Sequence, residues 1–457
     1  MPIVEILILC RVVDNYGDIG FVYRLARALS ALDPSLRLAL AVSDLTAFSY
    51  MAPGLDASKA FQRYCGWDVL DWNAAEQCAA WCRSHGVRLV IECFQCGRPD
   101  WLDAYLFGGG LPEGQTARII NLEYLTAEAW AEDFHLLKSG TRSASVKKVN
   151  FMPGFTPRTG GLLLERGFMD LLAGRDAARE RIRRQLAGQA GGLAGQSGLP
   201  DPSACNILVF SYEKDFTPLV RAFERFHAEG GKPVVYLAPG RGAASFKAAC
   251  TECAAAGAAA GAAGRTAGAP FPLVELPRLD QELWDALLVS CDVAFVRGEE
   301  SFARACLASR PFLWQAYRQD GAFHLVKVAA LLERMRDFFA PDDFSLLAEL
   351  FLLYNIDNSD AGIDAGIDAD KAAGAAAAGG SVADSAEAAE AVSALCPGLL
   401  PHLAESGWQD RRLAELAFRF LREGERLAPC FAAFSASLIA NGDLAAHLLA
   451  YLTSLNP

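Results

Sequence analysis

The sequence predicts an α/β protein with two domains, each built on a parallel sheet that helices cover. Apolar runs of strand length alternate with segments of helical periodicity in two separate series along the chain. The chain has 457 residues, 52% of them apolar, which is enough for two hydrophobic cores. We expect an N-terminal domain over 1–185, a second domain over 201–425, and C-terminal helices over 426–457 that pack back on the first domain.

The first series begins with a strand that is apolar on both faces, Ile3–Cys10, as in the interior of a parallel sheet. The loop Arg11–Gly20 connects it to a helix over Phe21–Leu32. Further strands are expected at Leu36–Val42, Val87–Glu92 and Ala117–Ile120, with a helix at Asn73–Ser84. The Pro- and Gly-containing stretches Phe151–Gly154 and Thr159–Leu164 suggest a connection between the domains.

The first loop carries two carboxylates, Asp14 and Asp18, where doubly wound sheets bind ligands. It lacks the Gly-x-Gly-x-x-Gly spacing of a dinucleotide site. Two interpretations stay open. The carboxylates form a base or a clamp for a cationic group, or Asp18 caps the helix while Asp14 makes an Asx turn.

The second series repeats the alternation. We expect strands at Asn206–Tyr212, Pro233–Ala238, Leu273–Leu276, Val293–Val296 and Phe312–Tyr317, and helices at Thr217–Ala228, Asp280–Val289 and Ala322–Met335. Gly240-Arg241-Gly242 is interpreted as a turn, because a lone Gly-x-Gly is weak evidence for a phosphate loop. His324 is expected to be a surface or hydrogen-bonded residue, although its strand–helix junction also allows it to face a ligand.

The end of the Val293–Val296 strand is the strongest candidate for an anion site. A glycine turn follows Arg297, and Ser301 begins a helix whose first N–H groups point at an anion. The Arg297 guanidinium can bind a diphosphate through two parallel hydrogen bonds. Glu299 and Glu300 do not suit a plain phosphate site. They either contact a sugar hydroxyl or a cation, or simply favour the helix N-terminus.

Composition limits the partners. The net charge of −12 argues against nucleic acid and anionic membranes. No apolar run reaches the length of a membrane span, and no signal segment is recognised, so we expect a cytoplasmic protein. The thirteen cysteines include two Cys-x-x-Cys pairs, at Cys93 and Cys250. We expect buried reduced thiols rather than zinc ligands, and no metal site.

Three stretches rich in Ala, Gly and Ser interrupt the pattern, at 186–200, 254–270 and 356–391. Such a composition buries too little apolar surface to offset the entropy of ordering, so we expect flexible inserts without a functional role. Apolar helices return at Leu413–Leu421 and Phe431–Leu455, and Asn441-Gly442-Asp443 separates the last two.

Five motifs together resemble the family of bacterial protein-arginine rhamnosyltransferases that act on elongation factor P. They are DNYGDIGFVYRLAR (Asp14–Arg27), NLEYL (Asn121–Leu125), MPGFTPRTGGLL (Met152–Leu163), RGEESFARA (Arg297–Ala305) and WQAYRQDGAFHLVK (Trp314–Lys327). The resemblance implies a GT-B fold, in which two Rossmann-like domains face each other across the active-site cleft. It also implies transfer of L-rhamnose from dTDP-β-L-rhamnose to an arginine of elongation factor P, with inversion and without a metal or cofactor.

The resemblance also implies roles for single residues. Asp18 is the general base, Asp14 supports it, and Glu299 belongs to the catalytic set. The donor-binding positions are Tyr16, Gly17, Phe210, Tyr212, Gln281, Arg297, Glu299, Glu300 and Ser301. Two positions depart from the family pattern: Glu300 replaces the usual Asp, and Arg278 stands where an aromatic residue usually precedes the glutamine.

The chemistry of the residues agrees with these roles. A protonated guanidinium is a poor nucleophile, so an arginine acceptor needs carboxylates that orient it and remove a proton. The departing diphosphate needs fixed donors, which Arg297 and Ser301 can supply. Two other functions remain possible: a GT-B transferase with another nucleotide sugar or acceptor, or a non-catalytic nucleotide-sugar-binding protein.

Overall fold

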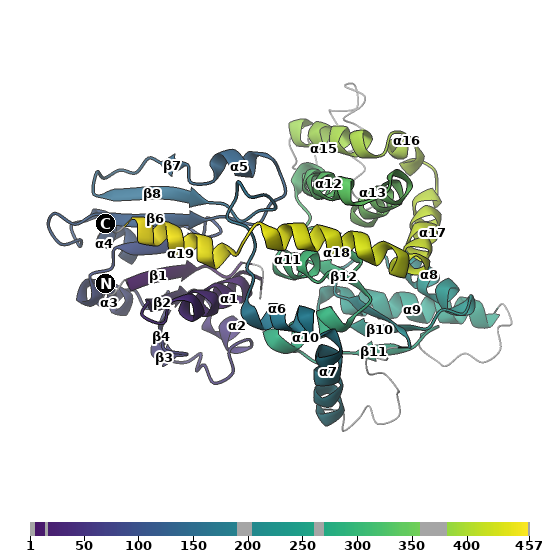
Figure 1. The fold of residues 1–457 in the computed structure, drawn as a ribbon, viewed down its shortest axis with the longest axis horizontal. Helices are drawn as coiled ribbons and strands as arrows, with labels where there is room; N and C mark the ends of the chain where they lie inside the picture. Colours follow the sequence, from purple (N-terminus) through teal and green to yellow (C-terminus); the bar gives the residue numbers. More distant parts are fainter. Residues whose placement is uncertain (1–4, 14–16, 190–202, 260–268, 357–381, 456–457) are drawn as a thin grey trace. The chain divides into compact units, whose positions relative to one another are not determined.

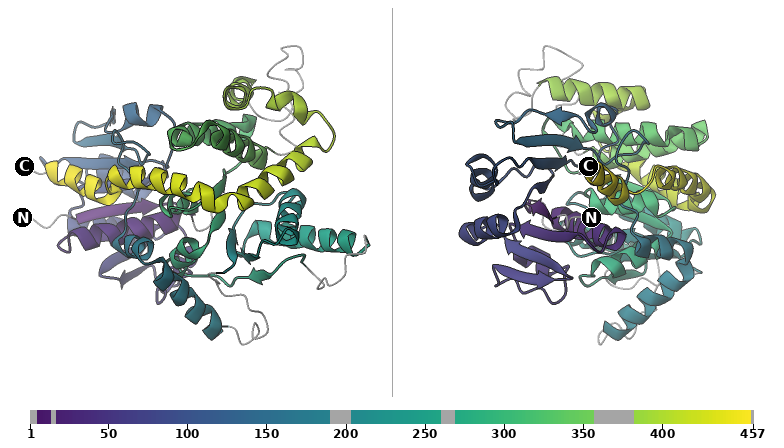
Figure 2. Two further views of the ribbon diagram at one scale, coloured as in Figure 1. Left: turned by 45° about the vertical axis from the view of Figure 1, so that its right-hand side comes forward. Right: turned by 60° about the vertical axis from the view of Figure 1, so that its left-hand side comes forward.

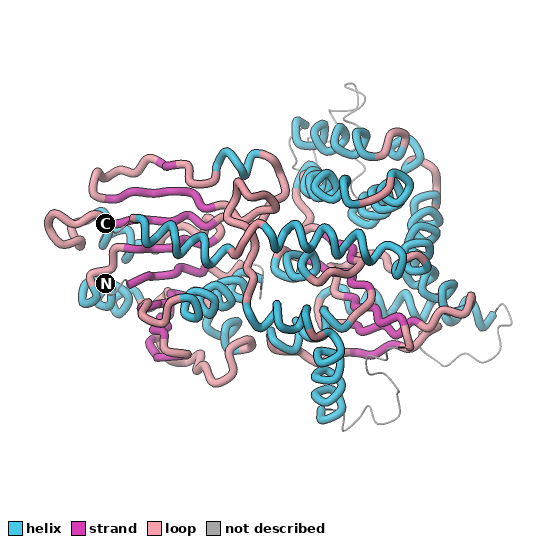
Figure 3. The backbone as a smooth tube through the Cα atoms, in the orientation of Figure 1, coloured by secondary structure: helices cyan, strands magenta, loops and turns pink. Residues whose placement is uncertain are grey.

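The computed structural model describes residues 5–13, 17–189, 203–259, 269–356 and 382–455 (Figure 1). The chain divides into two compact units, the first formed by Met1–Met169 with Leu438–Pro457 and the second by Asp170–Ser437. The boundaries lie within helices α6 (Arg166–Ala173) and α18 (Gly424–Ala440). Figure 3 separates the strands of each unit from its helices and loops.

The described part of the first unit contains an eight-stranded sheet in the order β3-β4-β2-β1-β5-β6-β8-β7. Its strands are β1 (Glu5–Cys10), β2 (Arg37–Val42), β3 (Phe61–Tyr64), β4 (Trp67–Asp71), β5 (Leu89–Cys93), β6 (Ala117–Leu122), β7 (Lys138–Ser139) and β8 (Val146–Phe151). The six inner strands of this order, β4, β2, β1, β5, β6 and β8, pair in parallel. Strands β3 and β7 pair antiparallel at the two edges. The carboxyl ends of the parallel strands therefore meet at one edge, where ligands of such sheets bind.

The sheet has a hydrophobic core on each face because successive side chains of a strand point to opposite sides. Ile6 and Ile8 of β1 pack with helices α1 (Gly17–Leu32), α2 (Leu45–Ser49) and α19 (Leu444–Ser454). Leu7 and Leu9 pack with α3 (Ala75–His85) and α4 (Asp100–Phe107) on the other face. Helices α1 and α19 lie side by side (Figure 1). The two cores explain why β1 is apolar throughout.

The glycine-rich stretch before α6 fastens the C-terminal helix to the first unit. The backbone N–H of Leu444 donates to the carbonyl of Leu162 at 2.9 Å, and Asp443 Oδ1 accepts from the N–H of Leu164 at 2.8 Å. A Cβ on Gly160 would lie 2.5 Å from the Phe151 ring and 2.8 Å from Leu444. The stretch that we interpreted as a connection between domains thus belongs to the first unit and receives α19.

The described part of the second unit contains a five-stranded parallel sheet in the order β11-β10-β9-β12-β13. Its strands are β9 (Cys205–Val209), β10 (Pro233–Leu237), β11 (Leu273–Glu275), β12 (Val293–Arg297) and β13 (Phe312–Gln315). Its helices include α7 (Arg175–Gln189), α8 (Thr217–Ala228), α9 (Arg241–Ala259), α10 (Gln281–Ser290), α11 (Glu300–Leu307), α12 (His324–Met335), α13 (Pro341–Asn355), α15 (Val382–Leu395), α16 (Leu399–Leu403) and α17 (Trp408–Arg422). Helix α8 packs against α17, and α12 packs beside α13 (Figure 2).

The predicted strands and helices are confirmed within a few residues, but two further expectations need correction. No helix or strand was predicted directly after Leu125, yet this stretch contains α5 (Trp130–Phe134) and the parallel strand β8. Parts of the three stretches that we expected to be flexible inserts are helical, because α7 and α9 continue into the first two and α15 begins within the third. Alanine-rich sequence favours helix, and Ala388 is fully buried. The remaining insert residues lie outside the described residues.

Helix α7 belongs to the second unit, whereas the sequence placed it in the first domain. The Arg175 guanidinium donates to the carbonyl of Cys291 at 2.8 Å and pairs with Asp292 at 2.7 Å, at the start of β12. Arg179 also pairs with Asp292, at 3.2 Å. These contacts place the beginning of the second unit before α7, at Asp170.

Candidate functional site

The carboxylate of Asp18 lies in the first turn of α1, beside the end of β1. Asp18 is 4% exposed, and its Oδ2 accepts a hydrogen bond from the backbone N–H of Val13 at 2.8 Å. The hydroxyl of Tyr124 lies 3.4 Å from Oδ1, and the Tyr124 ring stacks on Phe94 with centroids 4.4 Å apart. Burial raises the pKa of the neighbouring Cys10 thiol, and the charge of Asp18 raises it further. Asp18 is therefore a positioned carboxylate, contacted by residues that follow β1 and β6.

The other predicted residues of this loop are less informative. Gly17 is the first residue of α1. Asp14 and Tyr16 lie outside the described residues.

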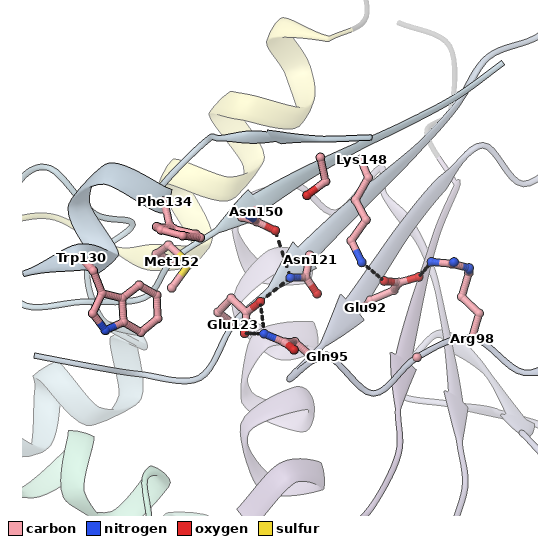
Figure 4. Close-up of a pocket in the computed structure, with 12 residues that line it drawn as sticks. Glu92, Gln95, Arg98, Asn121, Glu123, Trp130, Phe134, Lys148, Asn150 and Met152 are labelled. Atoms are coloured by element: carbon pink, nitrogen blue, oxygen red, sulfur yellow. Dashed lines mark hydrogen bonds and ion pairs between the residues drawn. The ribbon is translucent and has the colours of Figure 1, made fainter. Parts of the chain in front are cut away.

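A pocket of about 710 Å³ opens at the ends of β5, β6 and β8 (Figure 4). Glu92 lies at its base, 1% exposed, between Lys148 at 2.8 Å and Arg98. Burial alone would lower the pKa of Arg98, but its pairing with Glu92 and Asp103 raises it. Sequence reasoning missed this pocket, although one of its strands carries the motif Asn121–Leu125.

The second unit places Arg297 between two aromatic rings. The guanidinium carbon lies 4.5 Å from the ring centre of Phe210 and 4.4 Å from that of Tyr212. Strand pairing brings them together, since Phe295 is opposite Val209 and the N–H of Phe210 donates to the Phe295 carbonyl at 2.8 Å. The Nε of Arg297 is buried, and no described residue accepts a hydrogen bond from it. The cation is thus preorganised and has donors available for an anion.

The turn after Arg297 has the predicted strand–glycine–helix form. Gly298 has φ 67°, and its carbonyl accepts from the indole N–H of Trp314 at 2.9 Å. Glu299 is the N-cap residue of α11 without a side-chain capping bond, while Ser301 is buried in the first turn. Glu300 lies 3.7 Å from the buried Arg304. The first N–H groups of this helix add to the anion-binding capacity beside Arg297.

Helix α9 begins close to the same aromatic loop. A Cβ on Gly242 would lie 2.5 Å from the carbonyl oxygen of Ser211 and 2.8 Å from that of Tyr212. Glycine is therefore needed at position 242 for packing. The prediction that Gly240-Arg241-Gly242 is a turn is wrong for two of its residues, because Arg241 and Gly242 are the first residues of α9.

Gln281 is the first residue of α10 and is 8% exposed. One turn later Trp284 packs edge-on against Phe210, with ring centres 5.0 Å apart. Its indole nitrogen is buried and makes no hydrogen bond with the described residues. Sequence reasoning missed Trp284, although its i+3 spacing from Gln281 puts both on one helix face. This aromatic side chain lies near the candidate anion site, while Arg278 occupies the position that is usually aromatic.

His324 is a structural residue, as one of the two interpretations held. It is 2% exposed, and its Nε2 lies 3.1 Å from the carbonyl oxygen of Asn355. All thirteen cysteines are free thiols. Within the described ranges, no three His, Cys, Asp or Glu side chains are grouped so that they could hold a metal ion. In the same ranges every helix is too short or too polar to cross a membrane.

The structure therefore gathers the predicted residues at the strand ends of each unit: Asp18 in the first, and Phe210, Tyr212 and Arg297 in the second. A solved structure concerned with EarP-mediated arginine glycosylation of translation elongation factor EF-P has a similar fold, with a TM-score of 0.53 and 21% identity. The alignment covers 98% of this chain and 99% of that one. Two units with parallel sheets, the first completed by the C-terminal helix, form the GT-B fold.

A family model described as elongation-factor P (EF-P) rhamnosyltransferase EarP matches residues 6–453, and the chain belongs to this family. A protein-arginine rhamnosyltransferase of Pseudomonas putida is 37% identical over 77% of this chain and 86% of its own length. A protein-arginine rhamnosyltransferase of Shewanella oneidensis is 35% identical over 73% of this chain and 82% of its own. The resemblance inferred from the five motifs is confirmed.

Proposed function

We propose that this enzyme transfers L-rhamnose from dTDP-β-L-rhamnose to one arginine side chain of translation elongation factor P, with inversion at the anomeric carbon. The proposal includes no metal and no cofactor. It takes the reaction to occur in the cytoplasm, where the acceptor serves translation. Family membership supports the sugar and the acceptor.

The observation that carries the proposal is the placement of the Arg297 guanidinium and the lack of an acceptor for its Nε among the described residues. Its guanidinium is held between Phe210 and Tyr212, and its buried Nε makes no hydrogen bond with any described residue. A buried N–H donor without an acceptor is costly, so this Nε favours a ligand that supplies one. The diphosphate of a nucleotide sugar is a suitable ligand, because the guanidinium fork matches its oxygens.

The donor is bound by groups of the second unit and the first loop. Arg297 and Ser301 hold the diphosphate together with the first N–H groups of α11, and Glu299 and Glu300 contact the sugar. Phe210, Tyr212 and Gln281 contact the nucleotide, and Tyr16 and Gly17 are the donor-binding residues of the first loop. Glu299 belongs to the catalytic set because it lies directly after the Arg297 turn.

In the reaction a guanidine nitrogen of the acceptor attacks the anomeric carbon from the face opposite the diphosphate. The carbon–oxygen bond to the diphosphate breaks, and its electron pair stays on the departing dTDP. Asp18 accepts the proton that the nitrogen loses as the new bond forms, and Asp14 helps to orient the guanidinium. Arg297 and Ser301 stabilise the charge on the leaving diphosphate. One displacement gives inversion without a covalent enzyme intermediate.

Mass spectrometry of elongation factor P after incubation with the enzyme and dTDP-β-L-rhamnose tests the proposal. We expect a gain of one deoxyhexose on a single arginine. Transfer from another nucleotide sugar or to another acceptor would show that the protein is a GT-B glycosyltransferase with other substrates than those proposed. Donor binding without any transfer would identify a non-catalytic binding protein.

A further inference from the structure

The pocket beside β6 contains a buried carboxylate that no cation neutralises in the described chain. Glu123 is 9% exposed, and its carboxylate accepts hydrogen bonds from Gln95 Nε2, at 2.9 and 3.0 Å, and from Asn121 Nδ2. Both donors are neutral amides. The other pocket carboxylate, Glu92, already has two cationic partners. A buried carboxylate with only amide partners favours a cation beside it.

Asn121 adds a second acceptor to the same pocket. It is 4% exposed, and its amide nitrogen lies between the Glu123 carboxylate and Asn150 Oδ1, which is 3.1 Å away (Figure 4). Two acceptors on one side fix the orientation of the amide. Its Oδ1 is buried, and no described residue donates to it. The pocket can therefore accept several hydrogen bonds from one ligand.

The entrance to the pocket is apolar. Trp130 and Phe134 line it and are 44% and 46% exposed, and Leu136 and Leu137 are exposed next to them. Methylene stems of lysine and arginine pack on such surfaces, and aromatic faces attract their cationic ends. Large apolar side chains that gather on one exposed segment are typical of a protein-binding surface.

The pocket and Asp18 lie on opposite sides of β6. Side chains alternate along the strand, so Asn121 and Glu123 face the pocket while Leu122 packs in the core with α1. Tyr124 follows Leu122 in this alternation, and its hydroxyl reaches Asp18. A side chain that occupies the pocket is therefore different from the arginine that reaches Asp18.

We propose that this pocket binds a second basic side chain of the acceptor protein, near the arginine that is modified. The inference rests on the proposed function, because it takes the acceptor to be elongation factor P. The guanidinium or ammonium group donates to Glu123 and Asn121, and its stem lies against Trp130 and Phe134. The acceptor is then held at two points, and the second fixes the position of the target arginine.

Steady-state kinetics with elongation factor P and dTDP-β-L-rhamnose test this inference. Glu123→Gln should raise KM for the acceptor roughly 10- to 100-fold, the effect of one lost charge-assisted hydrogen bond, with kcat and the donor KM within about twofold. Trp130→Ala should raise the acceptor KM by roughly fivefold or more. Asp133→Asn is the matched control, since Asp133 is 78% exposed and pairs with Arg158 on the surface. It should change the acceptor KM by less than about twofold.

The partner residue is found by replacing the basic residues of the acceptor with alanine one at a time. The residue that occupies the pocket should cause no further loss when combined with Glu123→Gln. Additive losses for every basic residue would overturn the inference, as would equal effects of Glu123→Gln and Asp133→Asn. If Glu123→Gln does not fold, an unchanged acceptor KM of Trp130→Ala overturns it. Wild-type protein that transfers no rhamnose refutes the proposed function itself, whereas active variants with an unchanged acceptor KM refute only the pocket.

Discussion

Arg297→Ala should weaken the binding of dTDP without unfolding the second unit. The aromatic contacts of Arg297 already exist without a ligand, so we count only its interaction with the diphosphate as the loss on binding. The loss is at least one charge-assisted interaction with the diphosphate, about 1.5–3 kcal/mol. Because 1.4 kcal/mol is tenfold in Kd, titration calorimetry should give a Kd raised roughly 10- to 150-fold. The Kd of Arg297→Lys should lie between those of the wild type and Arg297→Ala, because lysine keeps the charge but lacks the planar fork.

Lys247→Ala is the matched control for this experiment. Lys247 lies in α9 of the same unit and pairs with Glu275 at 2.9 Å on the exposed surface. Its removal should leave the Kd for dTDP within about twofold, since surface ion pairs contribute little. A Kd for Arg297→Ala that matches wild type would refute the assignment and move the diphosphate site elsewhere.

Three further predictions concern other parts of the chain. Asp18→Asn should abolish transfer and leave the Kd for dTDP within a few-fold; surviving activity would show that Asp18 is only a structural carboxylate. Gly242→Ala should destabilise the second unit by about 1–3 kcal/mol in thermal unfolding, because the new Cβ meets a carbonyl oxygen at 2.5 Å. Gly167→Ala, whose Cβ meets nothing within 4 Å, should be neutral or stabilising, and equal effects would refute the packing argument. Burial lowers the pKa of His135 to about 4, and the charge of His447 adds to this, whereas the ordinary value is 6.5. The unfolded chain then binds more protons between pH 6.5 and 4, so stability should fall as the pH falls through this window. His135→Gln, which still accepts the hydrogen bond of the Met152 N–H, should show a shallower decline of Tm between pH 7 and 5, and an unchanged slope would contradict the assignment.

The fold was predictable where a strand is apolar on both faces. Runs such as β1 and β9 are buried on both sides, so their composition alone identifies them. Strand β8 (VKKVNF) was not recognised because its lysines look solvent-exposed. Lys148 is accommodated by its pairing with the buried Glu92 of β5. That partner is known only once the strand order is known.

The candidate site was predictable as separate residues but not as an arrangement. Phe210, Tyr212 and Arg297 were each named, yet the placement of the guanidinium between the rings depends on β9 lying beside β12. Trp284 and Glu123 were given no role. The sequence does not show that the indole nitrogen of Trp284 lacks a hydrogen bond with the described residues, or that Glu123 accepts one from a residue of another element. Local sequence gives the residue types at a strand end, while the register between strands decides which of them meet.

The return of α19 has a consequence for synthesis of the protein. Leu444, Leu448 and Leu452 belong to the same core as β1, so this core stays incomplete until nearly the whole polypeptide has left the ribosome. Domains usually fold in the order of translation, but here the second unit has all its residues first. The nascent first unit therefore keeps an apolar face uncovered until α19 has been synthesised.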